Sequence, residues 1–170
     1  REGVVSKEPV ANPVAGEVAM VDTSKILNDG DFAVSIIERQ IEARQCNIKG
    51  AKIIIAGGYG MGSKQNFDLL YKLAALLHGQ VGSTRAAVDA GYADHSTMIG
   101  QTGVTVKPKL YIAVGISGQV QHTVGMEKAD TIISINTDPD APINKLANYV
   151  IIGDARETVT KLIEKFSTKK

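Results

Sequence analysis

Short runs of aliphatic, mostly β-branched residues recur along the chain from residue 51 onward, and polar or glycine-rich stretches separate them. Each run is only a few residues long and is apolar almost throughout. Runs of this kind are typical of strands that are buried on both faces of a parallel sheet. The pattern predicts strands at residues 52–56, 80–84, 110–114, 131–135 and 149–152.

Helical periodicity occupies several of the intervals between these runs. Apolar residues between Phe67 and Leu77 are spaced three or four apart, which gives one apolar face to a helix that His78 and Gly79 end. We also expect a short helix at residues 86–90, a helix that begins near residue 120 and an amphipathic helix at residues 155–166.

The alternation of strands with helices over about 120 residues predicts an α/β fold. In this fold class a parallel sheet forms the middle of three layers, and helices cover both of its faces, as in Rossmann-like domains. Ligands of open parallel sheets bind at the carboxyl ends of the strands. The residues that follow each predicted strand are therefore the first candidates for a functional site.

Residues 1–50 have a different pattern. Residues 16–21 alternate as a short strand would, and Asn28-Asp29-Gly30 is a turn signal. The residues after this turn, from Phe32 to Ile36, again alternate between apolar and polar. The segment predicts a hairpin or the edge of another unit, so we place a boundary near residue 50.

Composition excludes several classes of function. The 170 residues suit one compact domain, and 19 Lys and Arg against 18 Asp and Glu give a net charge of +1. The longest basic run is the terminal Lys169-Lys170, so we expect no binding of nucleic acid through charge. No apolar run approaches the roughly 20 residues of a membrane helix, so we expect no membrane insertion.

The lone cysteine, Cys46, allows no internal disulfide, and no cluster of Cys and His has the spacing of a metal site. The first residues lack the order of a signal peptide. We therefore expect a soluble protein of a reducing compartment that holds no metal.

Small and polar residues follow the predicted strands. Arg85 follows the second strand, Ser117 the third, Asn136 the fourth and Asp154 the fifth, while glycines follow the first. Glycine lets a ligand approach the backbone closely, and Ser, Asn and Asp supply hydrogen-bonding groups. Because the strand ends meet at one edge of the sheet, this composition favours a nucleotide over an apolar ligand.

The glycine loop at residues 58–62 is a weak signal by itself. Its G-x-G-x-G spacing lacks the third glycine of the dinucleotide fingerprint, and Thr84-Arg85 stands where an acidic residue would hold a ribose. An NAD-binding Rossmann domain is therefore disfavoured, and a plain strand-to-helix turn explains the loop equally well. Arg85 is either a solvated cation or a ligand for phosphate or a reduced flavin.

Other residues at the same edge allow two interpretations. Backbone N–H groups of Ser117 to Gln119 would point at an anion if a helix begins there, with the helix dipole adding attraction. His122, in the first turn, is either a structural residue or part of a polar ring, and Asp154 either caps the last helix or binds a ribose. The chain has no G-x-S-x-G elbow, so we predict no catalytic residue.

Several longer motifs occur in a fixed order. They are Gly57-Gly-Tyr-Gly60, residues 66–71, residues 81–91, Ile99-Gly-Gln-Thr-Gly103, residues 109–118, Gln121-His122 and residues 135–143. Together they resemble the C-terminal, FAD-binding domain of the electron transfer flavoprotein α subunit, over about residues 51–170. The resemblance implies a DHS-like NAD/FAD-binding, Rossmann-like fold, with residues 51–170 as the FAD-binding domain and residues 1–50 as the remnant of a preceding domain and its linker.

The same resemblance implies one non-covalent FAD that lies along the strand ends. Arg85 would lie over the isoalloxazine ring, where its charge favours the negatively charged reduced flavin and raises its potential. Thr102 would approach the flavin N5, and His122 would sit near the pyrimidine carbonyl, also stabilising negative charge. The phosphates and ribityl chain would be bound by Ser117, Gly118, Gln119, Val120 and Gln121. The cofactor would be enclosed further by Thr84, Ile99, Gly100 and Gln101, and its adenosine would be held by Asn136 and Asp154.

Tyr59 departs from the family pattern, because many members have arginine at this place in the first glycine loop. A phosphate or adenine contact there is expected to change or to become a stacking contact. Residues 94–97 look more like sequences from anaerobic bacteria than like mitochondrial ones. We therefore expect a cytoplasmic protein, or one of the mitochondrial matrix if the source is eukaryotic.

As a member of this family the chain would be an electron carrier and not an enzyme. Its partners would be a β subunit that completes the flavin site and an acyl-CoA or related dehydrogenase, as in fatty acid β-oxidation. Because it begins with Arg1 and is short for the family, we expect it to be part of a longer subunit. An NAD- or thiamine-dependent enzyme domain on a related fold, and a domain that binds nucleotide only to hold an assembly together, are the alternatives.

Overall fold

The computed structural model describes residues 16–23, 26–32 and 48–168, which fall into two units described separately. In the first unit the strand predicted at residues 16–21 is wrong. Val18 and Met20 are 86% and 93% exposed, so no packing stabilises an extended pairing there. The turn signal is confirmed, because the Asn28 side chain accepts a hydrogen bond from the N–H of Gly30 at 3.0 Å. The alternating residues from 33 onward lie outside the described residues.

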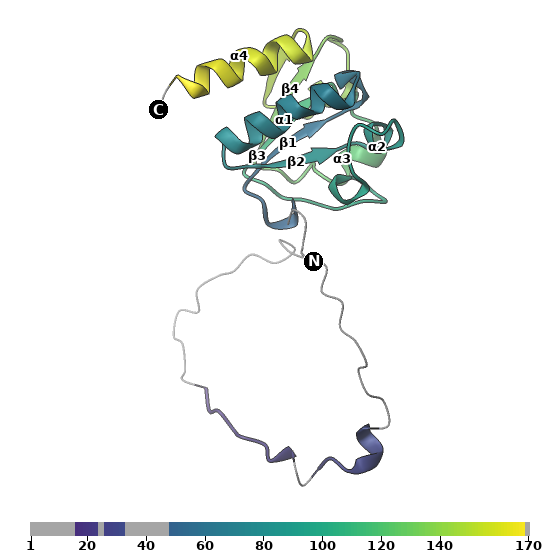
Figure 1. Cartoon of the computed structure of the whole chain (residues 1–170), viewed down its shortest axis with the longest axis vertical. Coiled ribbons are helices and arrows are strands. Elements are labelled where there is room, and N and C mark those ends of the chain that lie inside the picture. The colour runs from purple at the N-terminus through teal and green to yellow at the C-terminus, as the bar shows by residue number, and fades with distance from the viewer. Residues whose placement is uncertain (1–15, 24–25, 33–47, 169–170) are drawn as a thin grey trace. The chain divides into compact units, whose positions relative to one another are not determined.

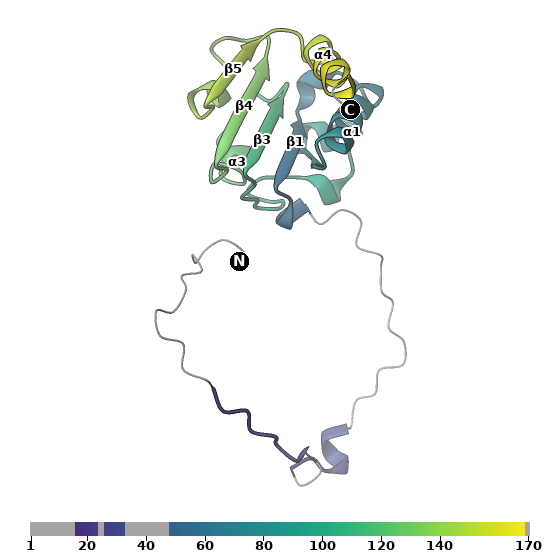
Figure 2. The same cartoon turned by 90° about the vertical axis from the view of Figure 1, so that its left-hand side faces the viewer.

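The second unit is built on a five-stranded parallel sheet, and Figure 2 shows β5 at the left-hand edge of this sheet, followed by β4, β3 and β1. The five strands predicted for this unit are all confirmed to within one residue at each end. The strands are β1 (Ile53–Gly57), β2 (Gln80–Ser83), β3 (Leu110–Val114), β4 (Thr131–Asn136) and β5 (Tyr149–Ile152).

The strand order is β2-β1-β3-β4-β5, and every pairing is parallel. The chain runs from β1 outward to β2 and then returns to the other side of β1 to form β3. Loops from β1 and β3 therefore leave the sheet in opposite directions, and a crevice opens between them at the carboxyl edge.

Two long helices, α1 (Lys64–Leu76) and α4 (Ala155–Ser167), lie side by side over one face of the sheet (Figure 1). Alternate strand residues such as Ile55 and Ile112 bury themselves against Phe67 and Leu70 of α1 and Val159 of α4. Each such side chain contributes roughly 1.5–3 kcal/mol on burial, so this layer fixes the sheet and the start of both helices.

The opposite face is covered by shorter elements. Ile54, Tyr111 and Ile132 pack there against residues of loops and single turns such as Met126 and Ile143. These elements are α3 (Val120–Thr123) and the 3-10 helices η3 (Ile48–Gly50) and η6 (Pro142–Lys145). Of the remaining short elements, η4 (Tyr59–Met61) lies in the loop between β1 and α1, and α2 (Arg85–Asp89) and η5 (His95–Thr97) follow β2. The predicted α/β, Rossmann-like fold class is confirmed, and the helix expected near residue 120 is a single turn.

The edge strand β5 differs from the buried run that the sequence predicts. All four of its residues are exposed, Tyr149 by 65%. An edge strand has a neighbour on one side only, and among the described residues no helix packs closely over β5.

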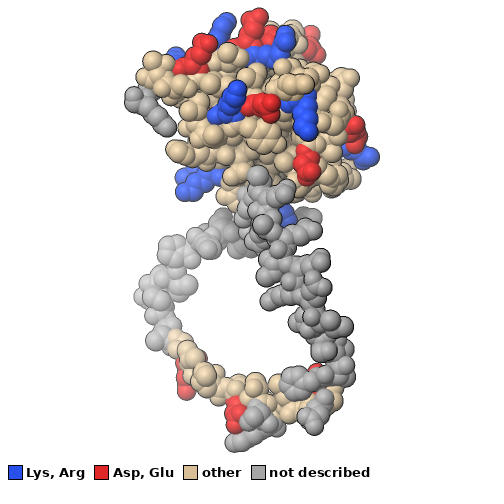
Figure 3. Space-filling model, in the orientation of Figure 1, with Lys and Arg blue, Asp and Glu red and all other residues tan. Residues whose placement is uncertain are grey.

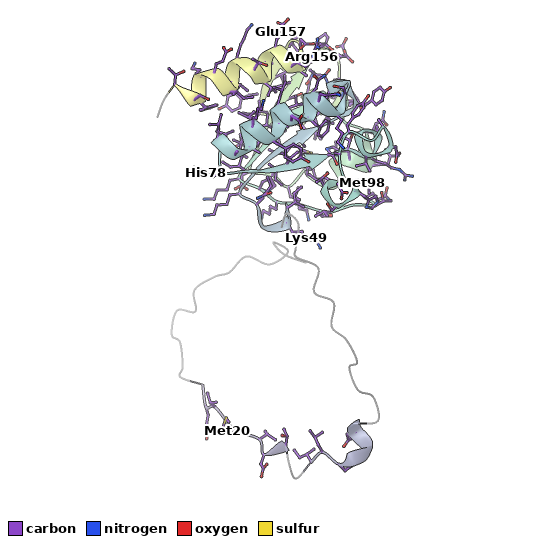
Figure 4. The ribbon with its side chains drawn as sticks, viewed as in Figure 1. Met20, Lys49, His78, Met98, Arg156 and Glu157 are labelled. Carbon is purple, nitrogen blue, oxygen red and sulfur yellow. The ribbon has the colours of Figure 1, made fainter. Side chains whose placement is uncertain are left out.

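The end of α1 follows the predicted stop. The helix ends at Leu76, and His78 adopts the left-handed conformation with φ of 53°. The N–H of Gly79 then donates to Ala74 O at 2.8 Å, and the N–H of His78 to Ala75 O at 3.3 Å, which is the Schellman pattern. In Figure 4 His78 lies at the opposite side of the domain from Met98, a residue of the cavity wall.

Candidate functional site

A cavity of about 660 Å³ opens at the carboxyl ends of the strands, on both sides of the crevice between β1 and β3. All but one of the residues predicted for the site line it. They are Tyr59, Thr84, Arg85, Ile99, Gly100, Gln101, Thr102, Ser117, Gly118, Gln119, Gln121, His122, Asn136 and Asp154. Val120 is the exception, because its side chain is 63% exposed outside the lining.

Further residues line the cavity that were not predicted as site residues. Asp89 stands four residues after Arg85 on α2, a spacing that could have revealed the pair. Met98 and Ala141 add apolar wall, and their buried positions follow only from the fold. Asp138, which follows Asn136 at the end of β4, adds a second carboxylate.

The loops after β1 and β3 touch through their backbones. A Cβ atom on Gly58 would come within 2.1 Å of the carbonyl oxygen of Gly115, so no other residue fits there without moving the loop. Gly118 has φ of +91°, and a Cβ atom there would meet the backbone N of Ile143 at 2.3 Å. Close contact between the loops therefore explains why glycine occupies both positions. Because these glycines have no side chains, the cavity wall that the loops form exposes backbone groups.

The loop after β3 offers N–H groups to a ligand. Within the described chain, no hydrogen bond uses the backbone N–H groups of Ser117, Gly118 and Gln119. Successive N–H groups in a loop with left-handed residues form a concave site for anions. The helix dipole expected from the sequence contributes little, since α3 is only four residues long.

Arg85 begins α2 at the mouth of the cavity. Its side chain is 71% exposed, and its Nε lies 3.4 Å from the Asp89 carboxylate. An ion pair this exposed stabilises the fold by at most about 1 kcal/mol, so the guanidinium can exchange Asp89 for a bound anion at small cost. Arg85 is the only Lys or Arg among the described residues that line the cavity.

His122 is buried in the cavity wall with both ring nitrogens engaged. Its Nδ1 lies 3.0 Å from the carbonyl oxygen of Ile99, and its Nε2 lies 2.9 Å from the hydroxyl of Tyr111. Burial lowers the pKa of His122 from 6.5 to about 4, against the opposing effect of the Ile99 carbonyl. His122 is therefore neutral at pH 7, whereas the resemblance implies a group that stabilises negative charge.

Asn136 holds the loop after β3 in place. Its Nδ2 donates to the carbonyl oxygen of Ile116 at 2.8 Å, and its Oδ1 accepts from the N–H of Asp138 at 3.0 Å. The side chain is 91% buried by these neighbours. Both ends of its amide are thus occupied within the chain, and its first role is to shape the cavity.

Asp154 caps α4, as one of its two sequence interpretations predicts. Its Oδ1 accepts hydrogen bonds from the N–H groups of Arg156 and Glu157 at 2.9 and 3.0 Å. Figure 4 labels both residues at the start of the helix. The hydrogen bond from Glu157 is the main cause that lowers the pKa of Asp154, and the carboxylate is therefore ionised at the cavity wall at neutral pH.

Tyr59 is supported by a second aromatic ring. Its ring stacks on Tyr92 with centroids 5.9 Å apart, and Tyr92 in turn packs against Phe67 of α1. Tyr59 remains 63% exposed and lines the cavity. An aromatic ring held in this way can stack with a planar ligand group.

The residues present fit FAD. Apolar residues of the wall, among them Met98, Ile99 and Ile116, suit a flat ring system, and the N–H groups of the loop after β3 suit a pyrophosphate. Arg85 can balance negative charge near this wall. The cavity lies at the topological switch point, where ligands of such sheets bind.

Other kinds of site find no support in the described part of the chain. Across residues 16–23, 26–32 and 48–168, no group of three or more His, Cys, Asp and Glu side chains is placed to hold a metal ion. No helix within these ranges is long and apolar enough to cross a membrane. On the face in Figure 3, basic and acidic side chains are interspersed, with no continuous basic patch of the kind that binds nucleic acid.

Residues 47–127 match the family of electron transfer flavoprotein FAD-binding domains. The chain is 42% identical over 171 residues to the electron transfer flavoprotein subunit alpha of Thermoanaerobacterium thermosaccharolyticum, which covers 100% of this chain and 51% of that protein. It is 53% identical over 139 residues to Protein FixB of Clostridium saccharobutylicum, covering 81% of this chain and 41% of that protein.

A mitochondrial relative is similar to nearly the same degree. The electron transfer flavoprotein subunit alpha, mitochondrial, of Dictyostelium discoideum is 40% identical over 163 residues, covering 87% of this chain and 45% of that protein. The chain thus spans about half the length of the curated relatives that it matches. With the parallel sheet and the cavity at its carboxyl edge, these matches show that this chain carries the FAD-binding domain of the electron transfer flavoprotein α-subunit family.

Proposed function

We propose that this chain binds FAD in the cavity at the strand ends and carries electrons from a dehydrogenase to a downstream acceptor, without converting a substrate of its own. The observation that best supports this proposal is the cavity itself, since fourteen of the fifteen residues implied by the resemblance line it. FAD is the cofactor of the family to which the domain belongs.

FAD, when bound, supplies the redox chemistry, and the chain determines how strongly and in which electrostatic environment it is held. The N–H groups of Ser117, Gly118 and Gln119 would bind the pyrophosphate. Arg85 would balance the negative charge of the reduced cofactor, and Thr102, exposed at the cavity wall, would hydrogen-bond to the ring edge. Asp138 and Asp154 would accept hydrogen bonds from ribose hydroxyls.

The partners follow from the family and are part of the proposal. A β subunit would cover the flavin from the open side of the cavity, where Arg85 and Gln101 are exposed. An acyl-CoA or related dehydrogenase would deliver the electrons. The compartment would be the cytoplasm in a bacterium, or the mitochondrial matrix in a eukaryote.

Titration with FAD tests the proposal. The purified chain, alone and co-expressed with an electron transfer flavoprotein β subunit, is stripped of cofactor and mixed with FAD, while flavin fluorescence and absorbance are recorded. We expect one FAD per chain and reversible reduction by dithionite in at least the complex. If neither preparation takes up FAD, the proposal is wrong.

Competing ligands separate the alternatives. A domain that only holds an assembly together would bind ADP as well as FAD and show no reversible flavin reduction. An enzyme domain would prefer NAD or thiamine diphosphate. We expect FAD to bind more tightly than ADP, NAD or thiamine diphosphate, because only FAD fills both the apolar wall and the loop after β3.

A pair of variants tests the role of Arg85. Arg85→Gln removes the positive charge that lines the cavity, while Lys161→Gln removes an exposed charge on α4 outside it. We expect Arg85→Gln to lower the potential of the bound flavin by several tens of millivolts, at about 59 mV for each 1.4 kcal/mol lost. Lys161→Gln should leave it unchanged. Equal effects of the two variants would remove the role given to Arg85.

A further inference from the structure

Three buried groups form a chain of hydrogen bonds behind the cavity wall. The Tyr111 hydroxyl of β3 lies 2.9 Å from His122 Nε2, and His122 Nδ1 lies 3.0 Å from the carbonyl oxygen of Ile99. Tyr111, His122 and Ile99 are 0%, 6% and 1% exposed. Ile99 and His122 line the cavity, whereas Tyr111 stands behind them in the core.

These partners determine where the imidazole carries its proton. The Ile99 carbonyl oxygen can only accept, so Nδ1 of His122 must carry a hydrogen and donate it. In a neutral imidazole Nε2 is then an acceptor, and the Tyr111 hydroxyl donates to it. Tyr111 has no other hydrogen-bond partner among the described residues, and a buried tyrosine hydroxyl needs one.

We propose that Tyr111 is a positioning residue of the cofactor cavity: its hydroxyl holds His122 as a neutral imidazole with the proton on Nδ1. With both nitrogens engaged, the ring lines the cavity without offering a positive charge. The consequence for the flavin rests on the proposed function: Arg85 would supply the positive charge, and His122 would supply shape. This role differs from that of a residue that touches the cofactor, since Tyr111 acts through His122.

The charges around His122 agree with a neutral ring. The charged side chains that line the cavity are Arg85, Asp89, Asp138 and Asp154, and none of them forms an ion pair with His122 in the described structure. Burial lowers the pKa of His122 to about 4 and raises the pKa of Tyr111, so both groups stay uncharged at neutral pH.

Nitrogen-15 NMR of the histidine side chains tests the inference without any cofactor. The chain has three histidines, and His78 and His95 are exposed. The variants His78→Asn and His95→Asn therefore assign the signals without changing the cavity. We expect His122 to show a proton on Nδ1 at pH 7 and to titrate near pH 4, well below the ordinary histidine pKa of 6.5. A proton on Nε2, or a His122 titration near the ordinary value of 6.5, would overturn the inference.

Tyr111→Phe removes the hydroxyl and keeps the ring, and Tyr149→Phe removes the hydroxyl of an exposed tyrosine on β5 as the control. Loss of the donor destabilises the neutral imidazole, so Tyr111→Phe should raise the pKa of His122 by about 1 and shift the Nε2 signal, while the Ile99 carbonyl keeps the proton on Nδ1. Tyr149→Phe should change neither. An unchanged His122 signal in Tyr111→Phe contradicts the inference, and the wild-type spectrum remains decisive if this variant does not fold.

The flavin measurement distinguishes the two proposals. In the FAD-loaded complex with the β subunit, Tyr111→Phe should make the flavin potential rise more steeply as the pH falls from 7 to 5, because His122 can then take up a proton. If FAD does not bind, the proposed function fails while the NMR result still decides the role of Tyr111. If FAD binds but the pH dependence matches that of wild type, the part that concerns the flavin is wrong.

Discussion

Replacement of Asn136 by Asp tests whether this side chain shapes the cavity from within. In the structure its Nδ2 donates to the Ile116 carbonyl at 2.8 Å, and its Oδ1 accepts from the N–H of Asp138 at 3.0 Å. Asn136→Asp keeps the size of the side chain and the acceptor. It replaces the donor by a second oxygen that faces the carbonyl oxygen of Ile116.

The magnitude follows from these two contacts. Loss of one hydrogen bond costs about 1 kcal/mol, and a buried carbonyl left without a donor opposite a carboxylate adds about 1–3 kcal/mol. We expect the free energy of unfolding at pH 7 to fall by about 2–4 kcal/mol, a large part of the roughly 5–15 kcal/mol of a typical domain. FAD affinity should fall as well, because the loop after β3 lines the cavity.

Asn148→Asp is a matched control. The Oδ1 of Asn148 accepts from the N–H of Ile132 at 2.8 Å, and no hydrogen bond given by its Nδ2 is present in the described structure. A carboxylate serves this N–H equally well, so we expect a change of less than about 1 kcal/mol. Urea unfolding of both variants measures the difference. A loss for Asn136→Asp no larger than that for Asn148→Asp would refute the reasoning.

The pH dependence of Asn136→Asp gives an independent check. Burial opposite a carbonyl raises the pKa of the new carboxyl in the folded state above its unfolded value of about 3.9. The protonated form can donate to Ile116 again. The loss of stability is therefore largest above the raised pKa and should shrink as the pH falls from 7 toward 4. A loss that is constant across this range contradicts the proposed contact.

Three further outcomes are expected. His78→Gly should stabilise the domain by about 0.5–1 kcal/mol in thermal unfolding, because glycine adopts the φ of 53° at the end of α1 without the strain of a side chain. Gly118→Ala should abolish FAD uptake and lower the free energy of unfolding by more than about 3 kcal/mol, because its Cβ atom would clash with Ile143. Gly91→Ala is the control: Gly91 has a φ of +73° but open space around it, so the free energy of unfolding should fall by only about 1 kcal/mol. Burial lowers the pKa of His122 from 6.5 to about 4, so the unfolded chain binds a proton at this residue at a higher pH than the folded chain does. The free energy of unfolding should therefore decrease by up to about 3 kcal/mol as the pH falls from 6.5 to 4. If wild type loses no more stability over this range than His122→Asn does, the neutral, buried ring is contradicted.

The sequence predicts the sheet well because its strands are short, apolar and separated by clear signals. The short apolar runs at Ile53 to Ala56 and Leu110 to Val114 predict buried strands, and both strands are confirmed. The prediction is wrong at residues 16–21, where alternation alone does not supply a partner strand. The exposure of β5 could not be predicted either, since strand order decides which strand lies at the edge.

The candidate site was predictable as a set of residues but not as a set of contacts. Strand ends and motif matches bring Arg85, Thr102 and Ser117 to the cavity. They do not reveal that the His122 ring binds Tyr111 and Ile99, because these partners lie 11 and 23 residues away along the chain. Tyr111 carries one usable signal, a hydroxyl in an otherwise apolar strand, which implies a buried partner without naming it.

The two kinds of residue at this cavity have different consequences for binding and for the flavin potential. Buried polar side chains such as Asn136 and His122 use their hydrogen-bonding groups on the protein itself, so they fix the position of the wall. Arg85 and Thr102 are exposed at the cavity, where a ligand can reach them, and Arg85 has only an exposed ion pair with Asp89 to give up. Substitutions of the first kind should therefore change stability and affinity together, whereas those of the second kind should change affinity or potential with the fold intact. A variant that alters the flavin potential without altering the unfolding free energy would accordingly identify a residue in direct contact with the cofactor, and Arg85 is the one whose charge is placed to do so.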